Sequence, residues 1–338
     1  MEKPKDKDFI ETHGGLIFCV VGYLHPPDRY TAYLKYSPSP EGRWSREGIR
    51  YARALKYYHV SQVEETYGYL EENHPEYLFD CPVRNITVSS VPFDSVEEYY
   101  KPRKRLSTIM DEGPRDRLEM KLIDLVTILK GLSGLDFRDL GVTGSLLTQN
   151  HSPEFSDIDL TVYGLEASQK LKETILMTRK EEGVFHPFNS AKKKLWSKDR
   201  ASRFPLDVNE LMDFAERRWN YGVFMDTYFS IHPVRTDEEI TENYGDHIYT
   251  QHGIVTGRGV ISESRDSIYL PAIYGLEDSE IEQVVQLISY EGLFCDMFDE
   301  GERVEFRGVL ERITGKSDYC RVVIGGAGSA QSYIKRIR

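Results

Sequence analysis

The strongest constraint on the fold is a change of hydrophobic period within residues 117–162. From Arg117 to Leu132, the apolar side chains recur with a 3.6-residue period, which predicts an amphipathic helix. The short apolar run Leu140–Thr143 then predicts a strand. In Ile158–Val162, apolar and polar residues alternate with the two-residue period of a half-buried strand. The order helix, strand, turn, strand predicts a core that mixes helices with a sheet.

The turn between these two strands and the start of the second strand carry residues suited to phosphate chemistry. Gly144-Ser145 is followed by eleven residues and then by Asp157-Ile158-Asp159. Side chains alternate along a strand at about 3.3 Å per residue, so Asp157 and Asp159 should point the same way, about 7 Å apart. Two such carboxylates can hold paired Mg²⁺ or Mn²⁺ ions about 3.5–4 Å apart. A glycine allows close approach of a phosphate, and the serine hydroxyl can donate to its oxygens.

Either feature alone has an ordinary structural explanation, because polar strand edges and Gly-Ser turns are common. In this order, after a helix and a strand, they form a more specific pattern. Residues 117–234 resemble the DNA polymerase β-like nucleotidyltransferase superfamily, whose pattern is an apolar strand, Gly-Ser or Gly-Gly, and then D-x-D. The resemblance implies that Asp157 and Asp159 bind the metal and that Gly144 and Ser145 contact the nucleotide phosphates. The chain is also similar in its domain arrangement to archaeal-type predicted nucleotidyltransferases with flanking domains, a likeness that identifies no substrate.

The same resemblance implies a third carboxylate on a neighbouring strand. Asp226 is the prediction, because it lies in Val223–Ile231, whose aromatic and β-branched residues favour a strand. The competing interpretation is a hairpin turn at Met225-Asp226-Thr227, where aspartate is common. Asp207, which also follows an apolar segment, is the substitute candidate.

Residues 191–203 are strongly basic in an otherwise acidic chain, with Lys192 and Lys193 as the candidate nucleotide-binding pair. Trp196 lies among the basic residues, and this combination can clamp a triphosphate or an acceptor nucleic acid. A solvated loop is the alternative, and the sequence leaves both open. The second basic run, Lys101–Arg105, is expected to be part of a linker.

The chain is predicted to be an α+β protein of three consecutive domains. A linker at about residues 100–114 separates an N-terminal α/β domain (1–110), with a helical pattern over Glu47–Tyr58, from a nucleotidyltransferase core (111–245). Residues 250–338 contain about five short β-rich runs, which predict a small OB-like β-barrel. The runs are 253–261, 268–270, 284–290, 303–313 and 319–324. The barrel is acidic overall, so structural or protein-binding roles weigh at least as much as nucleic-acid binding.

Composition limits the classes of partner. The 338 residues include 43 Lys plus Arg against 55 Asp plus Glu, a net charge of -12, so bulk charge will not attract a phosphate backbone. The four cysteines lie far apart and form no zinc-binding or disulfide pattern, which favours a reduced, cytoplasmic location. The longest apolar run, Gly14–Leu24, is too short to span a bilayer, so no membrane partner is expected. The oligomeric state stays open.

The predicted function is Mg²⁺- or Mn²⁺-dependent transfer of a nucleoside monophosphate from an NTP to an acceptor hydroxyl. The base preference is open, and so is the acceptor, which can be RNA, DNA, protein or a small molecule. The rival prediction is a catalytically inactive nucleotidyltransferase-like module that binds nucleic acid or a protein partner through its flanking domains.

Overall fold

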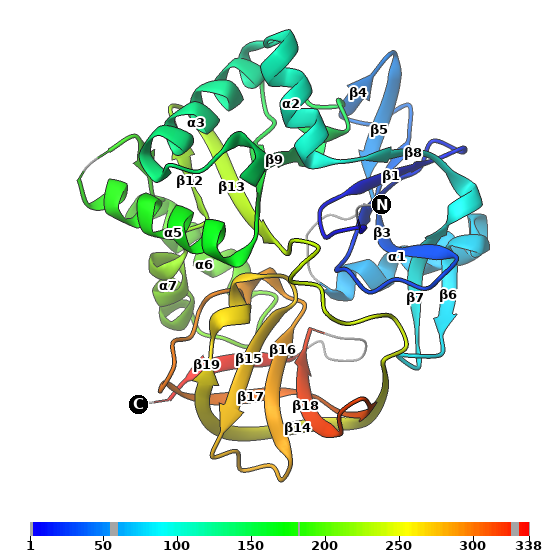
Figure 1. Cartoon of the computed structure of the whole chain (residues 1–338), viewed down its shortest axis with the longest axis vertical. Helices are drawn as coiled ribbons and strands as arrows, with labels where there is room; N and C mark the ends of the chain where they lie inside the picture. Colours follow the sequence, from blue (N-terminus) through cyan, green and yellow to red (C-terminus); the bar gives the residue numbers. More distant parts are fainter. Residues whose placement is uncertain (1–2, 55–59, 182, 326–330, 338) are drawn as a thin grey trace. The chain divides into compact units, whose positions relative to one another are not determined.

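The chain forms a mixed α and β fold with three β-sheets (Figure 1). The structure, a computed structural model, describes residues 3–54, 60–181, 183–325 and 331–337. The N-terminal sheet lies within residues 9–100, the central sheet within residues 140–234 and the third sheet within residues 247–336. The chain divides into two compact units, and each unit is assembled from three separate stretches. The first unit contains residues 1–56, 90–188 and 219–241, and the second contains residues 57–89, 189–218 and 242–338.

The N-terminal sheet has the order β4-β5-β3-β2-β1-β8, with β7 pairing with both β3 and β6. The expected helix over Glu47–Tyr58 is wrong at residues 49–53, which form a strand, and residues 55–59 lie outside the described part of the chain. A 14-residue helix, α1 (Val60–Asn73), follows. The strands are β1 (Phe9–Thr12), β2 (Ile17–Val20), β3 (Arg29–Pro38), β4 (Trp44–Arg46), β5 (Ile49–Arg53), β6 (Leu78–Cys81), β7 (Ile86–Pro92) and β8 (Val96–Tyr100).

The expected linker at 100–114 is wrong, because helix α2 (Pro102–Glu112) occupies it. The basic run starts this helix, since proline at the first helical position fits the helical φ angle and needs no N–H partner. Arg105 is buried and forms an ion pair with Glu119 at 2.5 Å, and its Nε donates to the carbonyl of Leu146 at 3.2 Å. These contacts hold α2 against the elements that carry the Gly-Ser turn.

The central sheet has the order β11-β12-β13-β10-β9, and its β10–β13 pair is parallel. The predicted helix is confirmed as α3 (Arg117–Ser133), with Asp116 as its N-cap and Gly134 in the left-handed conformation as its C-cap. Helix α3 packs against α5, which packs against β10. The remaining elements are β9 (Leu140–Thr143), α4 (Gly144–Leu147), β10 (Ile158–Tyr163), α5 (Leu165–Lys180), β11 (Phe185–His186), α6 (Ser190–Ala201), α7 (Val208–Arg217), β12 (Tyr221–Phe224) and β13 (Thr227–Val234).

The third sheet contains a ring of strand pairings. Its order is β14-β15-β16-β18-β17-β19, and an additional pairing of β14 with β17 joins the first and fifth strands. Strands β16 and β18 are parallel, and the other pairs are antiparallel. The predicted run 268–270 is not a strand: a 3₁₀ helix, Arg265–Ile268, includes its first residue, and the next strand begins at Ala272. The strands are β14 (His247–Glu263), β15 (Ala272–Glu277), β16 (Val284–Ser289), β17 (Arg303–Gly315), β18 (Tyr319–Ile324) and β19 (Tyr333–Arg336).

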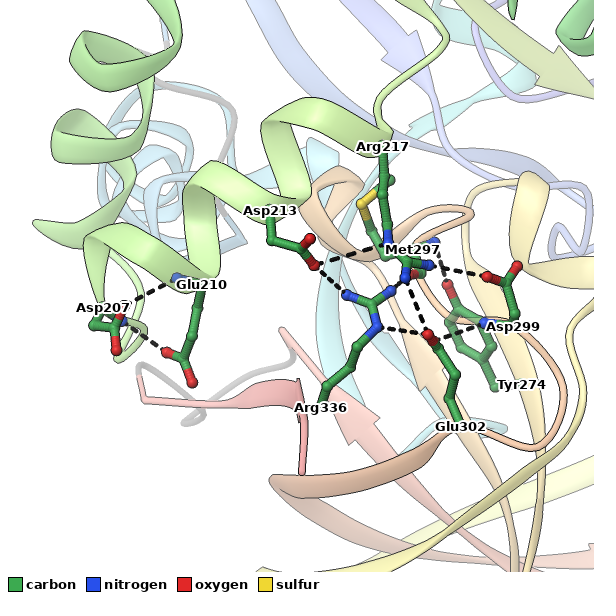
Figure 2. A network of polar contacts seen from close by, with 9 residues as sticks. All are labelled: Asp207, Glu210, Asp213, Arg217, Tyr274, Met297, Asp299, Glu302 and Arg336. Atoms are coloured by element: carbon green, nitrogen blue, oxygen red, sulfur yellow. Dashed lines mark hydrogen bonds and ion pairs between the residues drawn. The ribbon is translucent and has the colours of Figure 1, made fainter. Parts of the chain in front are cut away.

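Helix α7 packs against this third sheet through an apolar core and a polar network. Leu211 and Phe214 of α7 share a buried core with residues of β15 and β17. Arg336 on β19 donates to Asp213 on α7 at 2.7 Å and to Glu302 at 2.8 Å, and it also contacts the carbonyl of Met297 (Figure 2). Helix α7 and strand β19 are therefore held together within the second unit. No helix in the described ranges is long and apolar enough to cross a membrane.

Candidate active site around the paired aspartates

The two aspartates lie at the start of strand β10, which belongs to the central sheet. Ile158 and Leu160 are fully buried, and Asp157 and Asp159 are partly exposed, so the predicted alternation of the strand is confirmed. Asp159 pairs with Thr143 on the antiparallel neighbour β9 and with Ser230 on the parallel neighbour β13. Strand β10 is therefore an interior strand of the sheet, paired with β9 on one side and with β13 on the other.

The Gly-Ser turn lies directly against Asp159. Gly144 has a φ angle of +67°, which L side chains rarely adopt, and it begins the short helix α4. A Cβ atom at this position would lie 2.5 Å from Oδ2 of Asp159, closer than two such atoms can approach. The next residue, Ser145, is buried, and its carbonyl accepts from the backbone N–H of Asn150 at 3.1 Å. The two halves of the sequence pattern, 15 residues apart in the chain, are in contact.

Two residues of β13 hold the other oxygen of Asp159. The Ser230 hydroxyl donates to Oδ1 of Asp159. The same hydroxyl also lies 2.8 Å from Nε2 of His232, which is 3.8 Å from Oδ1 of Asp159. Sequence reasoning missed both residues. The available signal was their two-residue spacing on a strand, which places Ser230 and His232 on one face, and the parallel register then sets that face beside Asp159.

The two aspartate carboxylates carry like charges and repel each other when both are ionised. The charge of Asp159, together with burial, raises the pKa of Asp157 to about 6. Burial alone would raise the pKa of Asp159, but hydrogen bonds from His232 and Ser230 and nearby positive charge outweigh it and hold this pKa well below its usual range. Burial lowers the pKa of His232, which favours the neutral imidazole. The site therefore carries concentrated negative charge that a cation would relieve.

Basic side chains of the N-terminal segment act electrostatically on the residues of this site. Lys35 on β3 acts electrostatically on both aspartates, and Arg53 on β5 acts on Asp157. Lys7, before β1, is close enough to affect His232, and its backbone carbonyl accepts from the Thr143 hydroxyl at 2.8 Å. These three basic residues belong to the same compact unit as the aspartates. Sequence reasoning missed them because nothing local to Lys35 or Arg53 indicates which segment lies opposite.

The donor set fits a hard divalent cation that shares its coordination with a substrate. Among the described residues, no group of three or more His, Cys, Asp and Glu side chains is arranged to hold a metal ion. Mg²⁺, however, commonly binds proteins through one or two carboxylates and takes its other ligands from phosphates and water. In the described ranges, the Asp157 carboxylate accepts a hydrogen bond from its own backbone, and its remaining lone pairs can ligate a cation.

The expectation that Asp226 lies beside the other two aspartates is wrong. The predicted strand Val223–Ile231 is two strands, β12 and β13, joined by a hairpin turn at Met225-Asp226, with Met225 at a φ angle of +54°. Strand β13 places Ser230 opposite Asp159, and Asp226 precedes Ser230 by four residues, about 13 Å along a strand. The Asp226 carboxylate is exposed and forms ion pairs with Lys121 and, at 3.2 Å, with Arg117. The hairpin interpretation is the one that the structure supports.

Comparison with known proteins gives one relative and no fold assignment. The chain is 30% identical over 339 residues to a protein of Methanocaldococcus jannaschii named uncharacterized protein MJ1086. The alignment covers 98% of this chain and 99% of the archaeal protein. The chain belongs to the family of that archaeal protein. No protein-family model and no solved structure matches the chain.

In this member of the family, the other candidate residues lie in the second unit. Asp207 is the N-cap of α7, where its carboxylate accepts from the backbone N–H groups of Asn209 at 2.7 Å and Glu210 at 2.9 Å. A helix cap explains this aspartate without a metal. Lys192 and Lys193 lie on α6, not in a loop: Lys193 is buried and paired with Glu216, and Lys192 is exposed. The part of the basic segment that solvent reaches is thus Lys192 and its exposed neighbours.

Proposed function

We propose that the protein is a metal-dependent nucleotidyltransferase that moves a nucleoside monophosphate from an NTP to an acceptor hydroxyl. The observation that carries the proposal is the contact between Gly144 and Asp159, with Asp157 two residues away on the same side of β10. A glycine turn and a carboxylate pair in contact supply, at one place, a surface for phosphate and ligands for its cation. A solvated strand edge and an ordinary turn would need no such contact.

Each residue of the site has a role in this proposal. Asp157 and Asp159 would hold Mg²⁺ or Mn²⁺, which when bound stabilises charge on the phosphate oxygens. Gly144 and Ser145 would contact the triphosphate. Ser230 and His232 fix the orientation of the Asp159 carboxylate through its Oδ1 atom. Lys35 and Arg53 would lower the electrostatic cost of bringing a triphosphate toward two carboxylates.

The topology supports the same assignment. The run α3, β9, α4, β10, α5 with β13 parallel to β10 has the helix, strand, turn, strand order of the polymerase β-like core. In the third sheet, the ring order β14-β15-β16-β18-β17 resembles that of an OB-like barrel. Fold likeness supplies no substrate, so the acceptor and the base preference are left to experiment.

One observation favours the second candidate, an inactive nucleotidyltransferase-like module that binds nucleic acid or a protein partner. In the described part of the chain, Ser230 occupies the strand position opposite Asp159 where a third carboxylate was expected. A serine neither ligates a hard cation as a carboxylate does nor accepts a proton readily from an acceptor hydroxyl. The two candidates differ in whether NTP is consumed.

The deciding experiment incubates the full chain with each NTP labelled at the α-phosphate, Mg²⁺ or Mn²⁺, and RNA, DNA, protein and small-molecule acceptors. Asp157→Ala and Asp159→Ala should each reduce transfer about a thousandfold, the equivalent of about 4 kcal/mol in the transition state. Asp226→Ala is the matched control, an aspartate of the same unit that is paired elsewhere, and it should transfer at the wild-type rate. Near-wild-type turnover in either site variant would remove that aspartate from the mechanism, and no labelled product with any acceptor would favour the inactive module.

A further inference from the structure

A group of aromatic and arginine side chains lies beside the aspartates, and apart from Arg53 its members have no role in the proposed reaction. The Arg43 guanidinium lies over the Phe155 ring, 3.9 Å from its centroid. The Trp44 ring packs edge-on against Phe155, with centroids 5.9 Å apart. Arg53 lies over Trp44, 4.5 Å from its centroid, and the buried Tyr36 supports Trp44 from within. We call Arg43, Phe155, Trp44 and Arg53 the stacking cluster.

The stacking cluster is open to solvent on an otherwise ordered framework. Phe155 is 37% exposed, Arg43 and Arg53 are exposed, and Trp44 is partly exposed. Burial of a large aromatic ring is favourable, so an exposed phenylalanine held by two neighbours is a surface that a flat ligand can cover. The arginines and Trp44 come from strands β4 and β5 or the segment before them, which gives the cluster a rigid base.

The cluster is adjacent to the carboxylates. Phe155 precedes Asp157 by two residues, which limits their Cα separation to about 7 Å. Arg53 joins the cluster to Asp157 electrostatically, because its charge acts on that carboxylate. All these residues belong to one compact unit. If the phosphates of a nucleotide contact Gly144 and the aspartates, its base can therefore lie at the stacking cluster.

We propose that the stacking cluster is the nucleobase-binding site, where the base of the incoming NTP inserts between the Phe155 ring and the Arg43 guanidinium. The inference rests on the proposed function and adds to it the residues that bind the base. Aromatic rings and guanidinium planes both stack on nucleobases, and every base has a π face. The exposed Arg43 covers Phe155, and binding of the base between them requires its guanidinium to move outward by the thickness of one ring. Stacking alone discriminates weakly, so all four bases should bind with similar affinity.

Fluorescence of Trp44 gives a direct test that requires no transfer. ATP, GTP, CTP and UTP should each quench it, and Trp44→Phe should abolish the quenching. Inorganic tripolyphosphate should compete with the NTPs without quenching, because it lacks a base. The other two tryptophans are Trp196 and the buried Trp219. The titrations therefore use a Trp196→Phe background, in which the quenching reports on Trp44.

Substitutions test binding of the base separately from binding of the phosphates. Phe155→Ala should weaken NTP binding about tenfold or more and leave tripolyphosphate binding unchanged, since a stacked base contributes about 1–3 kcal/mol. Phe155→Tyr should restore NTP binding. Phe93→Ala is the matched control: Phe93 is 44% exposed and packs at a tilted angle against Tyr30, near the opposite end of β3 from Tyr36. Its loss should leave the binding of both ligands unaffected.

The outcomes distinguish the inference from the proposed function. If wild-type protein transfers nucleotides but Phe155→Ala binds NTP normally, or weakens NTP and tripolyphosphate equally, the base site is overturned and the proposed function stands. If NTPs quench Trp44 selectively but no acceptor is labelled, the base site stands and transfer does not. Quenching by a single-stranded oligonucleotide without a triphosphate, and not by NTPs, would overturn the inference and indicate an acceptor site.

Discussion

Replacement of Gly144 by alanine should destabilise the first unit by two separable contributions. A left-handed φ costs an alanine about 1–2 kcal/mol, and Gly144 has a φ angle of +67°. The new Cβ would lie 2.5 Å from Oδ2 of Asp159, so this carboxylate must move and lose its charge-assisted hydrogen bond from Ser230, worth about 1.5–3 kcal/mol. The expected loss in the free energy of unfolding is therefore about 2.5–5 kcal/mol.

Gly134→Ala is a matched control for the backbone contribution alone. Gly134 also has a φ angle of +67°, but the nearest atom to its added Cβ is the mobile Nζ of Lys170 at 3.7 Å. The Gly134→Ala variant should lose only about 1–2 kcal/mol in its free energy of unfolding. Urea denaturation, followed by fluorescence in a Trp196→Phe background, reports on the first unit through Trp44 and Trp219.

A double-mutant cycle tests the contact itself. In an Asp159→Ala background, the cost of Gly144→Ala should fall to the Gly134→Ala value, because the clashing oxygen is absent. Equal costs for the two glycine variants, or an unchanged cost in the Asp159→Ala background, would refute the direct contact on which the proposed function depends.

Three further predictions concern charge. The folded-state pKa of Asp157 is raised, so the free energy of unfolding measured without divalent cations should fall as pH rises from about 4 through about 6. Asp157→Asn should abolish this fall, and Mg²⁺ should suppress it. A denaturation midpoint that is independent of pH would contradict the prediction. Arg336→Ala should cost the second unit about 1–3 kcal/mol in thermal unfolding, whereas Arg258→Ala, which removes an exposed pair with Glu305, should cost about 1 kcal/mol or less. Lys192→Gln should reduce the salt dependence of single-stranded oligonucleotide binding, but Lys193→Gln should not, since Glu216 already neutralises Lys193; equal slopes for both variants would contradict this.

Local pattern predicted the elements that carry the paired aspartates. Helix α3 and strands β9 and β10 follow from hydrophobic periods within single segments, and the spacing of Gly144 and Asp159 anticipated a shared site. The Asp226 prediction failed because Met225-Asp226 forms a two-residue hairpin turn, the alternative that the local sequence had left open. Met225 takes a positive φ angle that methionine rarely adopts, so the residue types did not decide between strand and turn. The partners Lys35 and Ser230 depend on pairing between distant segments, which a local period does not encode.

The alternation of the two units along the chain has a consequence for biosynthesis. Residues of the first unit extend to position 241, and those of the second begin at position 57, so neither unit is complete until most of the chain has left the ribosome. Formation of the site must wait for β13, which supplies Ser230, to pair with β10 after more than sixty intervening residues have been synthesised. Closing such long loops slows folding, and early segments stay exposed in the meantime. We therefore expect nascent chains that end before residue 219 to be protease-sensitive and dependent on chaperones.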